Sequence, residues 1–342
     1  MSLLARSIKK TAVVFAYHNV GVRCLSVLLA AEVNVRLVVT HQDDPKEKVW
    51  FESVAKLAAQ HGIPIITPED PNTEEVITQI QALEPDFFFS FYYRKMLDQA
   101  LLTVPHEGAF NMHGSLLPKY RGRVPVNWAV IRGETETGAS LHEMTLKPDQ
   151  GALLGQQRVP ILPNDTAFEV FQKVTWAAEI VLENVLSDLL HGVAVRTQQN
   201  LAEGNYCYGR KPEDGRIDWS KSLQDIHNLV RGVAPPYPGA FTELAGIPAR
   251  ILRTQMIERS AFQSLTHATD PGHSGLAPQT LHPALKQPVV LHNDPQYGIW
   301  VDNGSGPLLA ILALDLGNHD SNPQDAASRL PKQTILFDCK VS

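Results

Sequence analysis

An unbroken apolar run, AVVFAY, occupies residues 12–17 and leads into the turn-like stretch HNVG at residues 18–21. Strands that are buried on both faces have such continuous apolar sequences, because polar residues do not alternate with the apolar ones. Two lysines precede the run, which gives it a loose likeness to a signal peptide. The apolar part is short and ends in a turn, so it predicts a buried first strand.

Helix and strand patterns alternate after this run. Helices are predicted at 22–32, 46–61 and 72–83, and strands at 35–40, 63–66, 86–93 and 109–112. Asn72 and Glu75 have the spacing of a capping box, and Gly62 is placed to end the preceding helix. A long helix is predicted at 166–191, opened by Thr166 and Glu169 at the same spacing. The alternation predicts an α/β domain with a parallel, doubly wound sheet over residues 1–203.

The second part of the chain has a different composition. Turn residues and short strands dominate after about residue 201, with strands predicted at 241–244, 249–256, 289–292, 297–301 and 308–315 and one helix at 222–233. Asp302-Asn303-Gly304 is a hairpin-type turn. Residues 204–317 are therefore predicted to form a small, barrel-like β domain. Residues 260–287 have a loop-like composition, and residues 318–342 are predicted to be a weakly structured tail.

The overall composition limits the classes of protein to which this chain can belong. With 342 residues and 44% hydrophobic content, the chain can bury two cores. Residues 1–203 carry 18 basic and 23 acidic residues, a charge of -5, and residues 204–342 carry 12 and 13, a charge of -1. Neither part is basic, which argues against nucleic acid as a partner. Three scattered cysteines form no disulfide framework, and no apolar run reaches the roughly 20 residues of a membrane span. We expect a cytoplasmic protein that is not inserted in a membrane.

The most informative motif, FNMHGSLLPKYRGR, occupies residues 110–123 and begins in a predicted strand. Open α/β sheets bind ligands at the carboxyl ends of such strands. Asn111 and His113 are two residues apart, so their side chains lie on one side of the strand. An amide that can stabilise an oxyanion would share a small volume with an imidazole that can move protons, as acyl transfer to an amine requires. The alternative is that Asn111 caps a turn and His113 is a structural residue.

A second element lies about 36 residues further along, in the stretch LKPDQG at residues 146–151. Asp149 precedes a glycine-containing turn and could orient a histidine as the acid of a catalytic triad does; the alternative is a plain turn aspartate. His142 and Glu143 are adjacent but lack metal-site spacing, so we favour a structural role for them. The 13 histidines show no tight ligand cluster, and we predict no metal.

Together these motifs resemble the 10-formyltetrahydrofolate-dependent formyltransferases. Asn-x-His at 111–113, Ser-Leu-Leu-Pro-x-Tyr-Arg-Gly at 115–122 and Asp-x-Gly at 149–151 occur in the same order and spacing, and the resemblance covers about residues 11–256. It implies an enzyme with a Rossmann-like N-terminal formyltransferase domain and a smaller β-barrel-like C-terminal domain. It also implies 10-formyltetrahydrofolate as co-substrate.

The resemblance implies a role for each matching residue. Asn111 would stabilise the tetrahedral intermediate and His113 would handle the proton. Asp149 would raise the basicity of His113 and hold its tautomer. The folate is expected to contact mainly the backbone of two segments, with Arg123 near by or else on a substrate phosphate. The segments comprise Lys95, Met96 and Leu97, and Thr145, Leu146, Lys147, Pro148 and Asp149.

Flanking residues indicate a branch of the family. FAYH at 15–18, SFYYR at 90–94, GETETG at 133–138, YGR at 208–210 and YPGAF at 237–241 resemble the polymyxin-resistance branch. Its formyltransferase domain acts on UDP-4-amino-4-deoxy-L-arabinose for lipid A, and so for lipopolysaccharide modification and antibiotic resistance. Its bifunctional members add an NAD-dependent decarboxylase domain. No such pattern follows here, so we expect formylation only.

Three alternatives stay open at this point. The acceptor could be another nucleotide-linked amino sugar or methionyl-tRNA, although the acidic balance and Arg123 count against tRNA. The chain could also bind folate or a nucleotide without turnover. The residues that read the sugar and base, and whether the chain forms a homo-oligomer, are not determined by the sequence.

Overall fold

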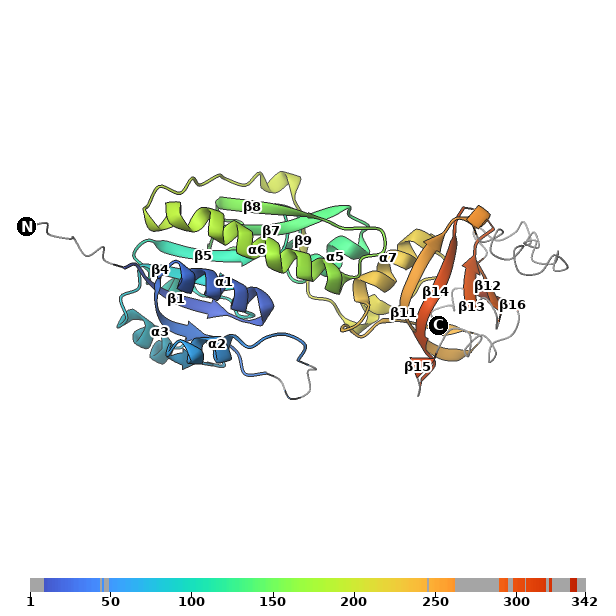
Figure 1. Cartoon of the computed structure of the whole chain (residues 1–342), viewed down its shortest axis with the longest axis horizontal. Helices are drawn as coiled ribbons and strands as arrows, with labels where there is room; N and C mark the ends of the chain where they lie inside the picture. The colour runs from blue at the N-terminus through green and yellow to red at the C-terminus, as the bar shows by residue number, and fades with distance from the viewer. Residues whose placement is uncertain are drawn as a thin grey trace, which may run out of the picture. The chain divides into compact units, whose positions relative to one another are not determined.

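The computed structural model describes residues 9–43, 45, 49–244, 246–261, 289–294, 298–304, 306–317, 320–321 and 333–336 (Figure 1). The chain forms two compact units. The first comprises residues 1–126, 136–160 and 170–209, and the second comprises residues 127–135, 161–169 and 210–342. Each unit therefore draws on several stretches of sequence, whereas the domains expected from the sequence were continuous.

The first unit is built on a sheet with the strand order β3-β2-β1-β4-β5-β7-β8. Its strands are β1 (Thr11–Ala16), β2 (Asn34–Val39), β3 (Ile65–Ile66), β4 (Phe87–Phe91), β5 (Gly108–His113), β7 (Glu136–Glu143) and β8 (Leu153–Pro160). The first five in this order are parallel, which confirms the predicted core of the sheet. The sequence pattern did not predict that β7 and β8 extend the sheet in antiparallel fashion.

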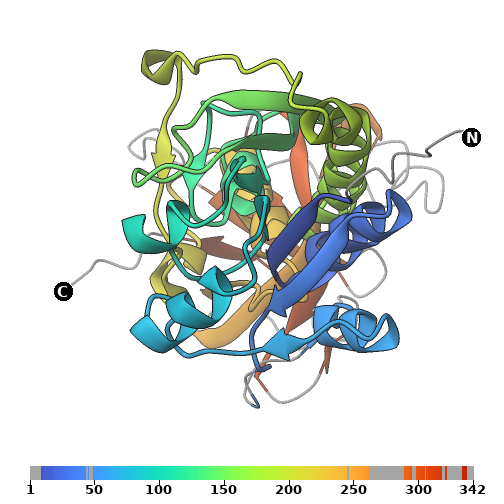
Figure 2. The ribbon, with the colours of Figure 1, turned by 90° about the vertical axis from the view of Figure 1, so that its left-hand side faces the viewer.

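Helices cover both faces of this sheet, as expected for a doubly wound fold. They are α1 (His18–Ala30), α2 (Val54–Gln60), α3 (Glu74–Gln81), α4 (Gln99–Leu102) and α6 (Ala167–Leu190). The short helix α5 (Pro125–Ile131) belongs mainly to the second unit. Figure 2 shows α1 and α6 on one side of the strands and α3 with α4 on the other. An ion pair between Arg23 and Glu179 joins α1 to α6.

Helix starts follow the capping residues, and two of the predictions were wrong in detail. The helix predicted at 46–61 begins only at Val54, because the Ser53 side chain accepts a hydrogen bond from the Lys56 amide at 3.2 Å and so caps it. Thr73, not Asn72, caps α3. The predicted box before α6 is confirmed: Thr166 and Glu169 bond each other's backbone amides at 2.7 and 3.3 Å.

One face of the central strands is covered by α3 and α4. Val13 and Phe15 of β1 point to this face because they alternate along the strand. Ile80 of α3 and Leu101 of α4 pack against them, fully buried. The Phe15 ring meets Phe88 of β4 edge-on at 5.2 Å. This apolar layer fixes β1 and β4, which in turn position β5.

The second unit is a smaller sheet domain, as predicted. Its strands are β10 (Ala240–Leu244), β11 (Ile247–Ile257), β12 (Val289–Asp294), β13 (Gly298–Asp302), β14 (Leu308–Asp315), β15 (Asp320–Ser321) and β16 (Gln333–Leu336), in the order β10-β11-β14-β13-β12-β16 with β15 beside β14. The ladders of the described strands do not join β10 to β16, so closure into a barrel stays a prediction.

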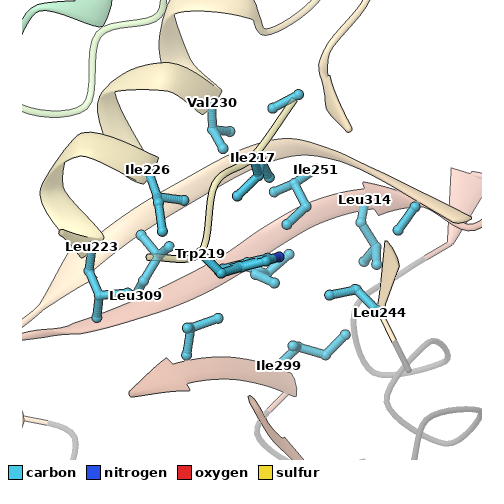
Figure 3. Close-up of a cluster of buried hydrophobic side chains, with 14 of the residues drawn as sticks. Ile217, Trp219, Leu223, Ile226, Val230, Leu244, Ile251, Ile299, Leu309 and Leu314 are labelled. Carbon is cyan, nitrogen blue, oxygen red and sulfur yellow. The ribbon is translucent and has the colours of Figure 1, made fainter. Parts of the chain in front are cut away.

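The core of this unit lies under α7 (Leu223–Val233), which Ser222 caps. Figure 3 shows Leu223 and Ile226 of α7 gathered with Ile251 and Leu309 of the sheet around the Trp219 ring. The predicted hairpin turn after β13 is confirmed, since the Gly304 amide donates to the Asp302 carboxylate at 2.7 Å.

Two short strands lie within the stretch that the sequence predicted to be a weakly structured tail. β15 pairs with β14, and β16 pairs with β12, so parts of residues 318–342 belong to the sheet. Most of the loop-like stretch at 260–287 lies outside the described residues.

Candidate active site

The end of β5 places the two predicted catalytic side chains on one face of the first sheet. Asn111 and His113 alternate with Met112, which is buried beneath them. Asn111 lies opposite Ser90 of β4 on one side and opposite His142 of β7 on the other. Residues directly opposite each other in a ladder present their side chains on the same face. The register therefore brings His142 to the Asn111 side chain.

Asp149 reaches the same place from the turn that follows β7. The turn gives Asp149 a φ of +55°. Two groups hold it: Gln199 Nε2 donates to the carbonyl oxygens of Asp149 and Gly151 at 3.0 and 2.7 Å, and the Gly122 amide donates to Asp149 Oδ2 at 2.8 Å. Gly151 leaves no room for a side chain, because a Cβ there would lie 2.0 Å from the Glu143 carbonyl oxygen.

The structure brings Asn111, His113 and Asp149 together. Asp149 Oδ1 lies 3.5 Å from His113 Nδ1 and 3.5 Å from Asn111 Nδ2. It also lies 3.3 Å from His142 Nε2. His113 and His142 are buried, and only 11% of the Asp149 side chain is exposed. One carboxylate oxygen is thus shared by an amide and two imidazoles.

Electrostatics favour an ionised Asp149. Burial by itself raises the pKa of this carboxyl group, because a charge is poorly solvated inside the protein. The positive charge that His113 carries when protonated and the hydrogen bond that the Gly122 amide donates act in the opposite direction and hold the pKa of Asp149 far below its usual range. The site therefore contains a fixed negative charge between two titratable rings.

Hydrogen bonding defines how His113 is held. Its Nε2 lies 2.8 Å from the Tyr120 carbonyl oxygen, which can only accept, so Nε2 carries a hydrogen. Its Nδ1 faces the Asp149 carboxylate. A proton arriving at Nδ1 is therefore received between an imidazole and a carboxylate. This arrangement suits a group that takes a proton from an attacking amine.

Side chains of the antiparallel strands β7 and β8 hold the loop at 115–122 in place beside the site. Ser140 Oγ donates to the Ser115 carbonyl oxygen at 2.6 Å and accepts from the Leu117 amide at 3.1 Å. Gln156 Nε2 donates to the Leu117 carbonyl oxygen at 2.9 Å. The loop then ends in β6 (Arg121–Gly122), which pairs with β9 (Tyr206–Cys207). These contacts fix the Tyr120 carbonyl and the Gly122 amide, the two backbone groups that hold His113 and Asp149.

The residues predicted to bind folate lie on two segments at the edge of one apolar cluster. Leu97 is a buried member of that cluster, and Met144, just before the second segment, packs against it. Met96 and Leu146 are 52% and 58% exposed, and Thr145 and Lys147 are also exposed. Leu97 can therefore offer only backbone groups to a ligand, while Met96 and Leu146 present apolar side chains. Their contact with folate stays a prediction.

An exposed arginine and two exposed tyrosines lie next to this centre. The Arg123 amide donates to the Cys207 carbonyl oxygen at 2.9 Å, and its side chain passes over Gly209. Tyr206 and Tyr208 are 40% and 76% exposed, and their ring centroids are 5.2 Å apart. A cation and two aromatic rings together form a surface that can meet phosphate and a planar base.

Sequence reasoning did not place His142 at this centre. We favoured a structural role for it because it lacks the spacing of a metal site and because neighbouring residues of a strand point to opposite faces. The antiparallel pairing of β5 with β7 puts its ring against Asn111 and Asp149. The sequence carries no local signal for this register, because the packing of the whole sheet sets it. Within the described part of the chain, no group of three or more His, Cys, Asp or Glu side chains is arranged to hold a metal ion.

Comparison with known proteins gives two family matches and a set of similar folds. Residues 21–186 match the formyl transferase family, and residues 210–326 match the formyl transferase C-terminal domain. An N-formyltransferase from Helicobacter canadensis, solved with folinic acid and dTDP-3-aminofucose, is 18% identical, with 89% of this chain and 99% of that chain covered and a TM-score of 0.64.

Two further solved structures have the same fold. WlaRD, a sugar 3N-formyltransferase solved with dTDP and 5-N-formyl-tetrahydrofolate, is 18% identical, with 88% of this chain and 96% of that chain covered and a TM-score of 0.62. A 4-N-formyltransferase from Francisella tularensis is 21% identical, with 68% of this chain and 91% of that chain covered and a TM-score of 0.55. A helix long and apolar enough to span a membrane does not occur in the described residues.

Proposed function

We propose, because this chain belongs to the formyl transferase family, that it moves the formyl group of 10-formyltetrahydrofolate to the 4-amino group of a UDP-linked amino sugar. UDP-4-amino-4-deoxy-L-arabinose, in a pathway of lipid A modification, is the acceptor we favour. The observation that carries the catalytic part is the convergence of Asn111 Nδ2 and His113 Nδ1 on Asp149 Oδ1, at 3.5 Å each.

The reaction follows from the chemistry of these groups. The neutral amine of the acceptor attacks the formyl carbon, and a new C–N bond forms while the carbonyl oxygen becomes an oxyanion. An Asn111 N–H stabilises that oxyanion. His113 takes the proton that the amine loses, and Asp149 stabilises the resulting imidazolium. The oxyanion then collapses to a carbonyl as the bond between the formyl carbon and N10 of the folate breaks. N10 receives the proton from the His113 imidazolium, and tetrahydrofolate leaves.

The donor site is proposed at the two segments that flank this centre. Met96 and Leu146 would cover the flat pterin and aminobenzoyl rings, and the backbone of 145–149 would bond the pterin edge. A separate hollow beside Lys95 is lined by Glu69, Asp70 and other residues between 66 and 79. The carboxylates that line this hollow would repel the anionic tail of folate. We therefore do not place the folate in the hollow, and we place its rings at Met96 and Leu146.

The acceptor side is proposed at Arg123. Its planar guanidinium suits two phosphate oxygens at once, which favours a nucleoside diphosphate over a single carboxylate. The exposed rings of Tyr206 and Tyr208 stand beside it for the base. The flanking motifs of the polymyxin-resistance branch, to which ArnA belongs, support UDP-4-amino-4-deoxy-L-arabinose over other nucleotide sugars. Two of the solved structures of similar fold contain dTDP or a dTDP-linked amino sugar, which supports a nucleotide-linked acceptor in general.

A second acceptor class is methionyl-tRNA. The net charge of -6 weighs against it, because tRNA binding relies on basic surface. A panel experiment separates these acceptors. The full chain is incubated with 10-formyltetrahydrofolate and, in turn, with UDP-4-amino-4-deoxy-L-arabinose, dTDP-linked 3-amino and 4-amino sugars, and methionyl-tRNA. Product mass reports the addition of one formyl group.

The expected result is rapid formylation of the UDP-linked sugar and slower reaction with the dTDP-linked sugars. Formylation of methionyl-tRNA alone would contradict the proposed acceptor but not formyl transfer. Binding of folate with no product from any acceptor would contradict both. Asp149→Asn serves as the inactive variant, and Asp188→Asn, an exposed site on α6, is its matched control.

A further inference from the structure

His142 sits in the candidate active site with all of its polar contacts inside the protein. Its side chain is 2% exposed. Nδ1 lies 2.7 Å from the carbonyl oxygen of Glu143, and Nε2 lies 3.1 Å from Asn111 Nδ2 and 3.3 Å from Asp149 Oδ1. The ring is thus held at both ends, and the end that faces the site touches two groups to which we assign catalytic roles.

The Glu143 contact decides the tautomer of this ring. A carbonyl oxygen has no hydrogen, so Nδ1 must carry one. In the neutral ring Nε2 is then an acceptor. The Asn111 amide faces two acceptors, His142 Nε2 and Asp149 Oδ1, so its NH₂ end, and not its oxygen, is favoured on that side.

Asn111 has two hydrogens on Nδ2, and they are held unequally. The contact with His142 at 3.1 Å is a normal hydrogen bond, whereas the contact with Asp149 at 3.5 Å is at the limit for one. One hydrogen is therefore anchored and the other is weakly held. An oxyanion that forms near Asn111 can recruit the second hydrogen without turning the amide.

We propose that His142, in its neutral Nδ1–H form, is a positioning residue that anchors Asn111 so that one amide hydrogen stays available for the oxyanion. The inference rests on the proposed catalytic role of Asn111.

Four residues determine the electrostatic environment of the His142 ring. Asp149 faces Nε2, and the His113 ring lies with its centroid 6.5 Å away. On the other side, Glu143 offers its backbone oxygen, while its carboxylate pairs with Arg196 at 2.6 Å. The carboxylate of Asp149 is therefore the charged group that the His142 and His113 rings share.

Two variants test the positioning role. His142→Phe keeps a planar ring and removes the acceptor. We expect kcat to fall about 10- to 100-fold, because the oxyanion donor is no longer fixed, with KM for both substrates within about twofold. His142→Gln, whose oxygen can accept from Asn111, should recover most of kcat.

A matched control and a second readout keep the test decisive. His227 is 1% exposed and bonds Thr254 and the Pro163 carbonyl, so His227→Phe removes an equally buried imidazole outside the site. Its kcat per folded molecule should not change. In side-chain amide NMR spectra of the resting enzyme, the two Asn111 hydrogens, assigned with Asn111→Asp, should be well separated in the wild type and converge in His142→Phe.

The outcomes separate this inference from the proposed function. A kcat in His142→Phe within twofold of wild type, or Asn111 resonances that do not respond to the substitution, overturns the positioning role. If no acceptor is formylated at all, the proposed function fails, yet the NMR comparison still decides whether His142 holds the amide. If His142→Phe does not fold, His142→Gln gives the decision: a kcat at least tenfold below wild type, or Asn111 resonances that converge in this variant, overturns the positioning role.

Discussion

The amide nitrogen of Asn111 lies 3.1 Å from Nε2 of His142, directly across the ladder between β5 and β7. Asn111 belongs to the parallel part of the sheet and His142 to the antiparallel extension. The candidate active site therefore lies where the sheet changes from parallel to antiparallel pairing. Four side chains, from β5, β7 and the turn after β7, meet there although 38 positions separate Asn111 from Asp149.

Replacing Asn111 with Ala should remove the oxyanion donor. We expect kcat to fall about 10²- to 10³-fold, the usual cost of losing one such donor. KM for the folate and the acceptor should change little, because the interaction forms mainly in the transition state. Steady-state kinetics with the best acceptor measure this. Asn184→Ala, at an exposed position on α6, is the control, and a normal kcat in Asn111→Ala would remove Asn111 from the mechanism.

Asp149 should contribute to stability in a defined pH window. Burial raises its pKa, but the charge of protonated His113 and the Gly122 amide outweigh burial, so the pKa in the folded protein is lowered. A carboxylate of this kind stabilises the fold fully above its unfolded pKa of about 3.9, and the contribution is lost as the pH falls toward the folded pKa. Urea unfolding from pH 3 to 7 measures this, and Asp149→Asn should show a shallower loss of stability at acid pH.

The turn that carries Asp149 depends on a glycine. A Cβ at Gly151 would lie 2.0 Å from the Glu143 carbonyl oxygen, so Gly151→Ala must move the turn. We expect kcat to fall at least tenfold and the free energy of unfolding to drop by about 1–3 kcal/mol. Gly192→Ala is the control: its φ is +72°, but no atom lies within 4 Å of the added Cβ. It should cost about 1 kcal/mol and leave kcat unchanged.

Arg123 should set the affinity for the acceptor and not for the folate. Arg123→Ala should raise KM for the nucleotide sugar at least tenfold with KM for the donor unchanged. Arg123→Lys should recover only part of the lost affinity for the nucleotide sugar, because an ammonium group cannot form the two parallel hydrogen bonds of a guanidinium. Tyr208→Ala should weaken the binding of UDP alone, measured by calorimetry. Equal effects on donor and acceptor would place Arg123 in the folate site instead.

The core of the second unit should be sensitive to truncation. Ile251 is fully buried beside the Trp219 ring (Figure 3). Ile251→Ala should lower the free energy of unfolding by about 2–5 kcal/mol, from lost burial and the cavity left behind. Ile180 on α6 is 46% exposed, so Ile180→Ala should cost less than about 0.5 kcal/mol. A thermal or denaturant unfolding curve compares the two.

The sequence by itself determined the parts of this protein that depend on local pattern. The apolar run at 12–17 and the helices and strands after it specified a doubly wound α/β unit, because burial on both faces leaves a continuous hydrophobic signature. Thr166 and Ser222 marked helix starts through their own side chains. The spacing of Asn111 and His113 placed both on one face of a strand.

Only the tertiary structure decided what those residues meet. β8 alternates between half-buried and exposed positions, and its antiparallel pairing with β7 has no local signature. The register of β7 against β5 is set by the packing of the whole sheet, and a shift of one residue would turn His142 to the other face. The sequence could name Asn111, His113 and Asp149. Long-range pairing alone brought His142 to them, because strand register is a property of the folded sheet and not of either strand.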